Sequence, residues 1–156
     1  MTWTDRFSLT GRVALITGAS SGIGAEIARV FADAGATILA SGRSESRLAA
    51  LADEIGPDCI ALKADIASVH GCRDLVATAL GHHDCIHILV NSAGVALVDP
   101  VLEAAVEDWD RTMAINLRAP FLLARGLAPA MIAKGAGKII NISSQTGVIA
   151  LPDHAA

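Results

Sequence analysis

Short apolar runs recur along the chain, and helix-like segments with mixed polar and apolar positions separate them. The runs lie at Val13–Ile16, Thr37–Ala40, Cys59–Leu62, Ile86–Val90 and Lys138–Ile142. Their length, and the Gly, Asn or charged residues around them, are typical of buried strands. The pattern therefore predicts five strands joined by helices.

The segments between the runs have the periodicity of amphipathic helices. Ala34–Gly35 is expected to close the first helix, and Ser44 and Ser68 are expected to cap the second and third. A longer helix is expected from Val106 to Ala133. The apolar positions of the first three helices are Ile23, Ile27, Val30 and Phe31, then Leu48, Leu51, Ala52 and Ile55, then Val69, Cys72, Val76 and Leu80.

Strands that alternate with helices pair in parallel through right-handed crossovers. We therefore expect a Rossmann-like α/β fold, a doubly wound parallel sheet with helices on both faces, in a single domain over residues 1–156. Ligands bind such sheets beyond the carboxyl ends of the strands, where the winding direction reverses. Candidate site residues are therefore expected where strands end.

The composition supports a folded domain and argues against two classes of partner. Hydrophobic residues make up 53% of the chain and charged residues 18%, so a sizeable core can form. The net charge is −4 with scattered Lys and Arg, so nucleic acid is not an expected partner. A helix that crosses a bilayer needs about 20 apolar residues, and the apolar runs of this chain are shorter. The first residues also lack a signal-peptide core. We therefore expect no membrane partner and a cytoplasmic location.

The cysteines Cys59, Cys72 and Cys85 are widely spaced and form no CxxC pair, which argues against a disulfide framework. We expect them to be reduced and buried. In the stretch His82–His87, Cys85 and His87 would share one face of a strand and could bind a metal. A solvated loop is the favoured interpretation, so no metal site is expected.

The first run leads into a glycine-rich turn, Thr17–Gly24, with Gly at positions 18, 22 and 24. Residues without a Cβ let backbone N–H groups and the positive end of the next helix approach a pyrophosphate. The turn therefore predicts dinucleotide binding, although an ordinary glycine-rich connection between strand and helix is the alternative.

The sequence TGASSGIG in this turn resembles the TGxxxGxG signature of the short-chain dehydrogenase/reductase family, and later motifs follow that family in order. Asn91–Gly94 resembles the family's NNAG motif, with Ser92 in place of the second Asn. Asp65 matches the family's adenine-side acidic residue, with a helix-capping Asp as the alternative. From this resemblance the expected cofactor-binding residues are Thr17, Gly18, Ser20, Ser21, Gly22, Ile23, Gly24, Asp65, Ile66, Asn91, Ala93 and Gly94.

The end of the second strand decides between NADP and NAD, because the adenosine ribose lies there in this fold. The family's acidic position aligns with Gly42, and Arg43 and Ser44 follow it. A guanidinium matches the geometry of a phosphate, so Arg43 with Ser44 favours NADP. NAD stays open, because Ser21 stands where some NADP-preferring relatives carry a basic residue.

Asn116 and Ser144 match the family's catalytic Asn and Ser. Pro120 has no N–H to bond to the carbonyl of Asn116, so that carbonyl is free to hold a water in a proton relay. A simple bend of the helix is the alternative. Ser144 is chosen by alignment of Gly147, with Ser143 as the second choice.

In the family a Tyr and a Lys follow this Ser, and the spacing places the Tyr just beyond Ala156. The chain contains no Tyr, so we expect the amino-terminal portion of a longer enzyme, incomplete at its C-terminal side. The resemblance implies a homo-oligomer, tetramer or dimer, that transfers hydride between NADP(H) or NAD(H) and a carbonyl/alcohol substrate. We expect negligible turnover from these 156 residues alone. The alternative is a non-catalytic nucleotide-binding or interaction protein derived by truncation.

Overall fold

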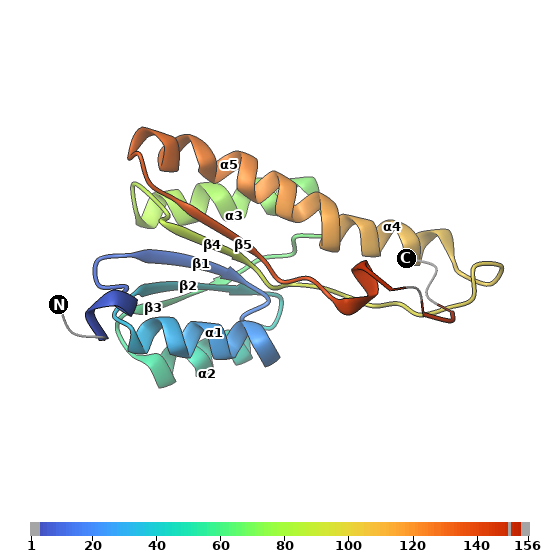
Figure 1. Ribbon diagram of the computed structural model, residues 1–156, viewed down its shortest axis with the longest axis horizontal. Helices are drawn as coiled ribbons and strands as arrows, with labels where there is room; N and C mark the ends of the chain where they lie inside the picture. The colour runs from blue at the N-terminus through green and yellow to red at the C-terminus, as the bar shows by residue number, and fades with distance from the viewer. Residues whose placement is uncertain (1–3, 150, 154–156) are drawn as a thin grey trace.

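The computed structural model describes residues 4–149 and 151–153. Its centre is a five-stranded parallel sheet in the order β3-β2-β1-β4-β5 (Figure 1). The chain winds outward from β1 to β3 and resumes at β4 on the other side of β1, which confirms the doubly wound Rossmann-like sheet. The strands are β1 (Val13–Thr17), β2 (Thr37–Gly42), β3 (Cys59–Lys63), β4 (Ile88–Asn91) and β5 (Lys138–Asn141).

Helices cover both faces of the sheet, as predicted. α1 and α2 lie on one face, and α3 and α5 lie on the other (Figure 1). Within the described ranges no helix has the combined length and hydropathy of a transmembrane segment. The helices are α1 (Gly22–Asp33), α2 (Glu45–Ile55), α3 (Val69–His82), α4 (Val106–Met113) and α5 (Ala119–Ala133), with 3-10 turns at Thr4–Phe7 and Gln145–Gly147.

The helix expected from Val106 to Ala133 is continuous, but it contains a widened turn. A π-helical segment at Ala114–Arg118 joins α4 to α5, and the N–H of Ala119 donates to the carbonyl of Ala114. The widened turn lies directly before Pro120, whose missing N–H cannot complete an α-helical bond. We call the whole segment from α4 to α5 the long helix.

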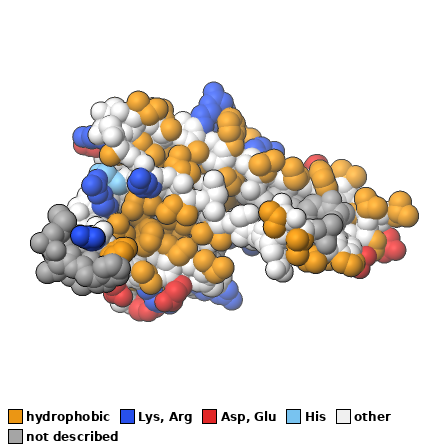
Figure 2. All heavy atoms as spheres, in the orientation of Figure 1, with side chains coloured by type: hydrophobic (Ala, Val, Ile, Leu, Met, Phe, Trp, Pro, Cys, Tyr) orange, Lys and Arg blue, Asp and Glu red, His pale blue; other side chains and the backbone are white. Residues whose placement is uncertain are grey.

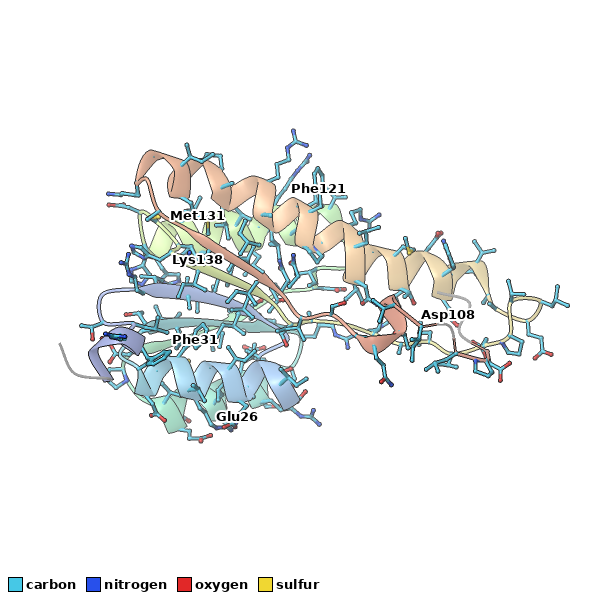
Figure 3. The ribbon with its side chains drawn as sticks, in the orientation of Figure 1. Glu26, Phe31, Asp108, Phe121, Met131 and Lys138 are labelled. Atoms are coloured by element: carbon cyan, nitrogen blue, oxygen red, sulfur yellow. The ribbon has the colours of Figure 1, made fainter. Side chains whose placement is uncertain are left out.

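The strands contribute side chains to a core on each face, because successive residues point to opposite sides. Leu15 and Leu89 pack toward α3 and α5, where Met131 points from α5 toward the sheet (Figure 3). Ile38 and Val90 belong to the core beneath α1 and α2. The continuous apolar runs of the sequence therefore correspond to strands that are covered on both faces.

β5 is an edge of the sheet within the described residues. The side chains of Ile139, Ile140 and the following Ile142 are 42%, 39% and 40% exposed. Figure 2 shows hydrophobic side chains gathered on the face that carries β5. An apolar edge of this kind favours pairing with further polypeptide.

The predicted strand boundaries differ from the observed ones by one or two residues; β4, for example, begins at Ile88 rather than Ile86, and β5 ends at Asn141 rather than Ile142. His87, which directly precedes β4, makes hydrogen bonds through both its backbone and its side chain to residues at the starts of β1 and β5. Its N–H donates to the Val13 carbonyl and its carbonyl accepts from the Lys138 N–H, both at 2.9 Å. Its Nδ1 accepts from the Val13 N–H at 3.1 Å. His87 therefore links the beginnings of β1 and β5 through the residue that precedes β4.

The cysteines Cys59, Cys72 and Cys85 are free and buried, as predicted. Burial raises the pKa of the Cys59 thiol to about 11 and also raises that of Cys72. Among the described residues, no group of three or more His, Cys, Asp or Glu side chains is placed to hold a metal ion.

We predict that protonation of His87 destabilises the chain. Burial lowers the pKa of His87 below its ordinary value of 6.5, and the charges of Arg12 and Lys134 act in the same direction. The unfolded chain therefore takes up the proton first, and stability is lost as the pH falls from 6.5 through the folded-state pKa. Urea titrations at about pH 7 and about pH 5 should show a larger loss for the wild type than for His87→Asn, whose amide oxygen accepts from Val13 at either pH. Equal pH dependence in the two proteins would contradict the prediction.

Candidate functional site

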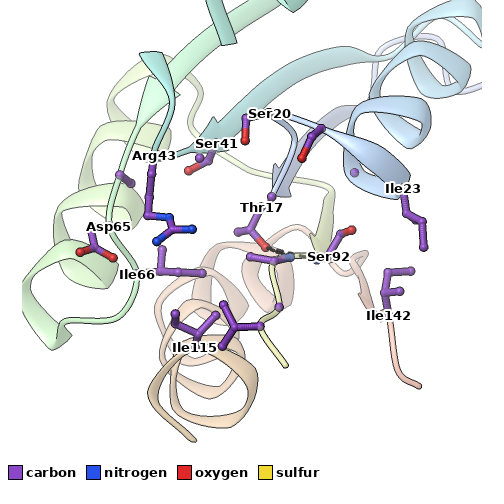
Figure 4. A pocket seen from close by; sticks show the side chains of 18 residues that line it. Thr17, Ser20, Ile23, Ser41, Arg43, Asp65, Ile66, Ser92, Ile115 and Ile142 are labelled. Carbon is purple, nitrogen blue, oxygen red and sulfur yellow. Dashed lines mark hydrogen bonds between the residues drawn. The ribbon is translucent and has the colours of Figure 1, made fainter. Parts of the chain in front are cut away.

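Two adjoining cavities lie at the carboxyl ends of the strands. The first has a volume of about 290 Å³ and lies where β1, β2, β3 and β4 end, and we call it the switch-point cleft (Figure 4). The second has a volume of about 830 Å³ and lies between β4, β5 and the long helix, and we call it the Ser144 cavity. The residues that line both are Ser92, Ala93, Gly94, Val95 and Ile142.

Most of the site residues predicted from the sequence line one of these cavities. Only Gly22 and Ser44 line neither. The predicted residues in the switch-point cleft are Thr17, Gly18, Ser20, Ser21, Ile23, Gly24, Arg43, Asp65, Ile66, Ala93 and Gly94. Those in the Ser144 cavity are Asn91, Ala93, Gly94, Asn116, Ser143 and Ser144.

The glycine turn after β1 brings three stretches of backbone into contact. Gly18 has φ +70°, and a Cβ there would lie 2.8 Å from both the Cα and the N of Ala93. A Cβ on Gly24 would lie 2.5 Å from the Gly18 carbonyl oxygen. Ser21, the N-cap residue of α1, makes no side-chain capping bond. The helix start therefore keeps uncapped N–H groups at the edge of an open cleft, as anion binding requires.

Thr17 joins the ends of β1 and β4. Its buried hydroxyl accepts from the N–H groups of Ser92 and Ala93, each at 3.2 Å, and donates to the Val90 carbonyl at 3.4 Å (Figure 4). Thr17 was predicted as a cofactor-binding residue, and it lines the cleft. Its side-chain oxygen, however, is used to hold the two strand ends together.

Arg43 is the basic residue of the cleft and directs its guanidinium into it, between Asp65 and Thr17 (Figure 4). Within the described residues Arg43 makes no hydrogen bond or ion pair, so all its donors are available. The neighbouring Gly42 lies close to the glycine turn, because a Cβ there would be 3.1 Å from Ser20 Oγ. Ser44, predicted to assist Arg43 and to cap the second helix, stands at the N-cap position of α2 without a side-chain capping bond and does not line the cleft.

Asp65 stands on the cleft wall after β3. Its Oδ1 accepts from the Ala67 N–H at 3.1 Å. α3 is capped instead by Ser68, whose hydroxyl accepts from the Gly71 N–H at 2.9 Å. The helix-capping alternative for Asp65 is therefore wrong, and its other carboxylate oxygen has no partner among the described residues.

Asn116 lies in the π-helical turn and holds the segment after β4. Its Oδ1 accepts from the Val95 N–H at 3.0 Å, and its Nδ2 donates to the Val95 carbonyl at 2.8 Å. The side chain thus makes a two-bond clamp on one backbone residue. The preceding Ile115 lines the switch-point cleft while Asn116 lines the Ser144 cavity, so the π turn contributes to both.

Ser144 and Ser143 both line the Ser144 cavity. The hydroxyl of Ser144 accepts from the Thr146 N–H at 3.3 Å and from the Thr146 hydroxyl at 2.9 Å, which caps the following 3-10 turn. These bonds fix the Ser144 oxygen at the cavity wall and leave its own proton to donate. The predicted Tyr position lies just beyond Ala156, and residues 154–156 lie outside the described ranges.

Asn91 and Ser92, the first two residues of the NNAG-like turn, both line the Ser144 cavity. Asn91 lies at the Ser144 cavity, and its Nδ2 donates to Asn141 Oδ1 at 2.8 Å, which joins β4 to β5. Its own Oδ1 is buried and has no partner among the described residues. Ser92, where the family has Asn, borders both cavities, and its hydroxyl makes no hydrogen bond within the described ranges.

Sequence reasoning missed several lining residues. Ser41, Val95, Ile115 and Ile142 line the switch-point cleft. Of these, only Ser41, which is 1% exposed at the end of β2, could have been predicted from the sequence. A polar residue that ends an apolar run often faces a site. The other three are apolar, and only their placement in space brings them to the cleft.

The chain belongs to the short-chain dehydrogenase family, because the family model described as short chain dehydrogenase matches residues 12–156. It is 44% identical over 156 residues to a D-threitol dehydrogenase from Mycolicibacterium smegmatis, matching 96% of this chain and 59% of the relative. It is 40% identical over 151 residues to an NAD-dependent glycerol dehydrogenase from Listeria innocua, with the same two coverages of 96% and 59%. The chain therefore spans less than two thirds of the length of these relatives.

Solved structures of the family share the fold closely. A metagenomic short-chain oxidoreductase in complex with NADP superposes with a TM-score of 0.90 at 39% identity, over 94% of this chain and 68% of the other. A gluconate 5-dehydrogenase from Burkholderia cenocepacia in complex with NADP and tartrate gives a TM-score of 0.90 at 38% identity, over 99% of this chain and 62% of the other.

Proposed function

We propose that the switch-point cleft binds a nicotinamide dinucleotide, NADP in preference to NAD, for hydride transfer to or from a carbonyl/alcohol substrate in the Ser144 cavity. The observation that carries this proposal is the backbone contact between Gly18 and Ala93 beside the uncapped start of α1. A Cβ at Gly18 or Gly24 would push this backbone apart, so the glycines keep the turn and the helix start together beside the open cleft, which fits a pyrophosphate. The NADP complexes of two similar structures support it. NAD is the alternative cofactor, because one similar protein is an NAD-dependent glycerol dehydrogenase.

Each part of the site has a separate task in this proposal. The N–H groups of the glycine turn bind the pyrophosphate, Arg43 binds the ribose 2′-phosphate, and the free carboxylate oxygen of Asp65 accepts from the adenine. The bound dinucleotide supplies or accepts the hydride. Ser144 donates a hydrogen bond that orients the substrate oxygen, and the backbone carbonyl of Asn116, which Pro120 cannot bond, holds a water for proton transfer.

In the family that the chain resembles, a Tyr serves as the catalytic acid/base, and this chain contains no Tyr. We therefore expect the 156-residue chain to bind cofactor with negligible turnover. Binding without turnover even when the residues that follow in a longer protein are present would favour the non-catalytic nucleotide-binding alternative. If this chain alone reduced carbonyl substrates at ordinary rates, the prediction that its acid/base residue is missing would be wrong.

Arg43 provides the test of cofactor choice. We predict that Arg43→Gln weakens NADPH binding about 10- to 100-fold, because charged hydrogen bonds to the 2′-phosphate are lost. NADH affinity should change less than about 2-fold, since NADH lacks that phosphate. Isothermal titration of both cofactors measures the effect, and Arg47→Gln, on the exposed side of α2, is the matched control. A wild-type chain that binds neither cofactor would contradict the proposed function itself.

We also propose that the protein is a homo-oligomer formed partly through the long helix. Leu117 and Phe121 are 62% and 61% exposed there, and Phe121 projects away from the sheet (Figure 3). They border a groove of about 720 Å³ that also contains Asp110 and Arg118. An exposed apolar stripe flanked by both charges is typical of a helix that pairs with a second copy, and light scattering measures the resulting mass.

A further inference from the structure

The loop Asp65–Ser68, between β3 and α3, forms one wall of the switch-point cleft through Asp65 and Ile66. Ile66 is only 9% exposed. The loop is tied internally, because Asp65 Oδ1 accepts from the Ala67 N–H and Ser68 caps the helix that follows. These bonds give the wall a defined local shape, but they do not attach it to the rest of the site.

Arg118 attaches this wall to the long helix. Its Nη2 donates to the Ala67 carbonyl at 2.6 Å, across 51 positions of sequence. Burial raises the pKa of the Cys72 thiol, and the positive charge of Arg118 partly offsets that rise. The same thiol donates to the Ile66 carbonyl at 3.3 Å. The guanidinium therefore lies against the loop and the first turn of α3. A bond from a charged donor is stronger than one between neutral groups.

Gly71 holds the other side of the wall. It lies in the first turn of α3, and a Cβ at this position would overlap the carbonyl oxygen of Asp65. That oxygen is a backbone atom, so it can move only if the cleft wall moves with it. Gly81, near the end of the same helix, has no atom within 4 Å of its Cβ position. The close contact is therefore specific to the helix start.

The segment that carries Arg118 also reaches both cavities. Ile115 and Ile66 lie on the same side of the switch-point cleft (Figure 4), and Asn116 clamps Val95 at the Ser144 cavity. The bond from Arg118 thus joins two structures that have no other hydrogen bond among those of the described residues. One is the wall formed by the loop Asp65–Ser68, and the other is the π turn that borders the Ser144 cavity.

We propose that Arg118 and Gly71 are positioning residues that hold the Asp65–Ser68 wall in its cofactor-binding shape. The inference rests on the proposed function, because it assigns these residues to the adenosine half of that site. A wall that is already in place binds without the cost of ordering it. Loss of either residue should therefore weaken binding of the adenosine half of NADPH and leave the nicotinamide half unaffected.

The test compares three probes, namely NADPH, 2′,5′-ADP for the adenosine half, and reduced nicotinamide mononucleotide for the other half. Arg118→Met and Gly71→Ala should each weaken NADPH and 2′,5′-ADP by about 5- to 10-fold and the mononucleotide by less than about 2-fold. Arg118→Lys should recover part of the loss. Arg118→Met should also speed amide hydrogen exchange of Ile66 and Ala67, which needs no ligand.

Three control variants separate a local effect from general destabilisation. Arg111→Met removes a cation from the same groove that has no bond to the loop among the described residues. Gly81→Ala adds a Cβ in open space, whereas Gly126→Ala adds one 2.8 Å from Val76 Cγ2, between α3 and α5 and outside the cleft. Gly126→Ala should lower the melting temperature and leave 2′,5′-ADP affinity within about 2-fold of wild type.

The inference is overturned if Arg118→Met binds 2′,5′-ADP as tightly as wild type and leaves amide exchange unchanged. It is also overturned if Gly126→Ala loses as much affinity as Gly71→Ala at an equal melting temperature. In both cases a wild-type chain that binds NADPH leaves the proposed function intact. A wild-type chain that binds neither NADPH nor 2′,5′-ADP overturns the proposed function and this inference together.

Discussion

Replacing Gly18 with Ala is expected to destabilise the chain by about 2–5 kcal/mol and to abolish measurable NADPH binding. Gly18 has φ +70°, and a left-handed conformation costs an L-residue about 1–2 kcal/mol. The added Cβ would also lie 2.8 Å from two backbone atoms of Ala93, and relief of such a clash costs about 1–3 kcal/mol. Relief requires the ends of β1 and β4 to separate, which changes the cleft itself.

Gly11→Ala is the matched control for this substitution. Gly11 has φ +73°, close to that of Gly18, but no atom lies within 4 Å of its Cβ position. It should therefore cost only the conformational term of about 1–2 kcal/mol and leave NADPH affinity unchanged. Urea unfolding and isothermal titration of both variants make the comparison. Equal losses of stability and affinity in the two proteins would show that the contact with Ala93 has no separate importance.

Thr17→Val is expected to be nearly as costly, although it preserves the shape of the side chain. The hydroxyl of Thr17 accepts from two backbone N–H groups, those of Ser92 and Ala93, in a buried position. A methyl group there leaves both donors without a partner, at about 1–3 kcal/mol for each. We expect a loss of about 2 kcal/mol or more in the free energy of unfolding, with weaker cofactor binding because the turn after β4 is released.

Thr17→Ser separates the hydroxyl from the methyl group at the same position. Serine keeps the oxygen that accepts from Ser92 and Ala93, so it should lose about 1 kcal/mol, the value of a buried methyl group. Denaturant titrations of the three proteins rank them directly. If the Val variant were as stable as the Ser variant, the bonds between β1 and β4 would not be what Thr17 contributes.

The sequence alone predicted the elements of this protein and most of the residues that line its two cavities. Apolar runs such as Val13–Ile16 and the amphipathic stripes between them depend on local periodicity, which is visible in one dimension. The same holds for Gly18 and Gly24, since a turn that must approach other backbone excludes a Cβ wherever it folds. Arg43 was predicted because it follows the end of the second strand, and Asp65 because it matches the family's acidic residue; both line the cleft where the strand ends meet.

Only the tertiary structure decided which of these groups bind one another. The Thr17 hydroxyl meets Ser92 and Ala93 because β1 and β4 are neighbours in register, a pairing that local propensity does not encode. The same applies to the bond from Arg118 to Ala67, which depends on where the long helix crosses the sheet. Periodicity and turn chemistry act between near neighbours in the chain, whereas these contacts join residues far apart in sequence, so their partners are selected by packing.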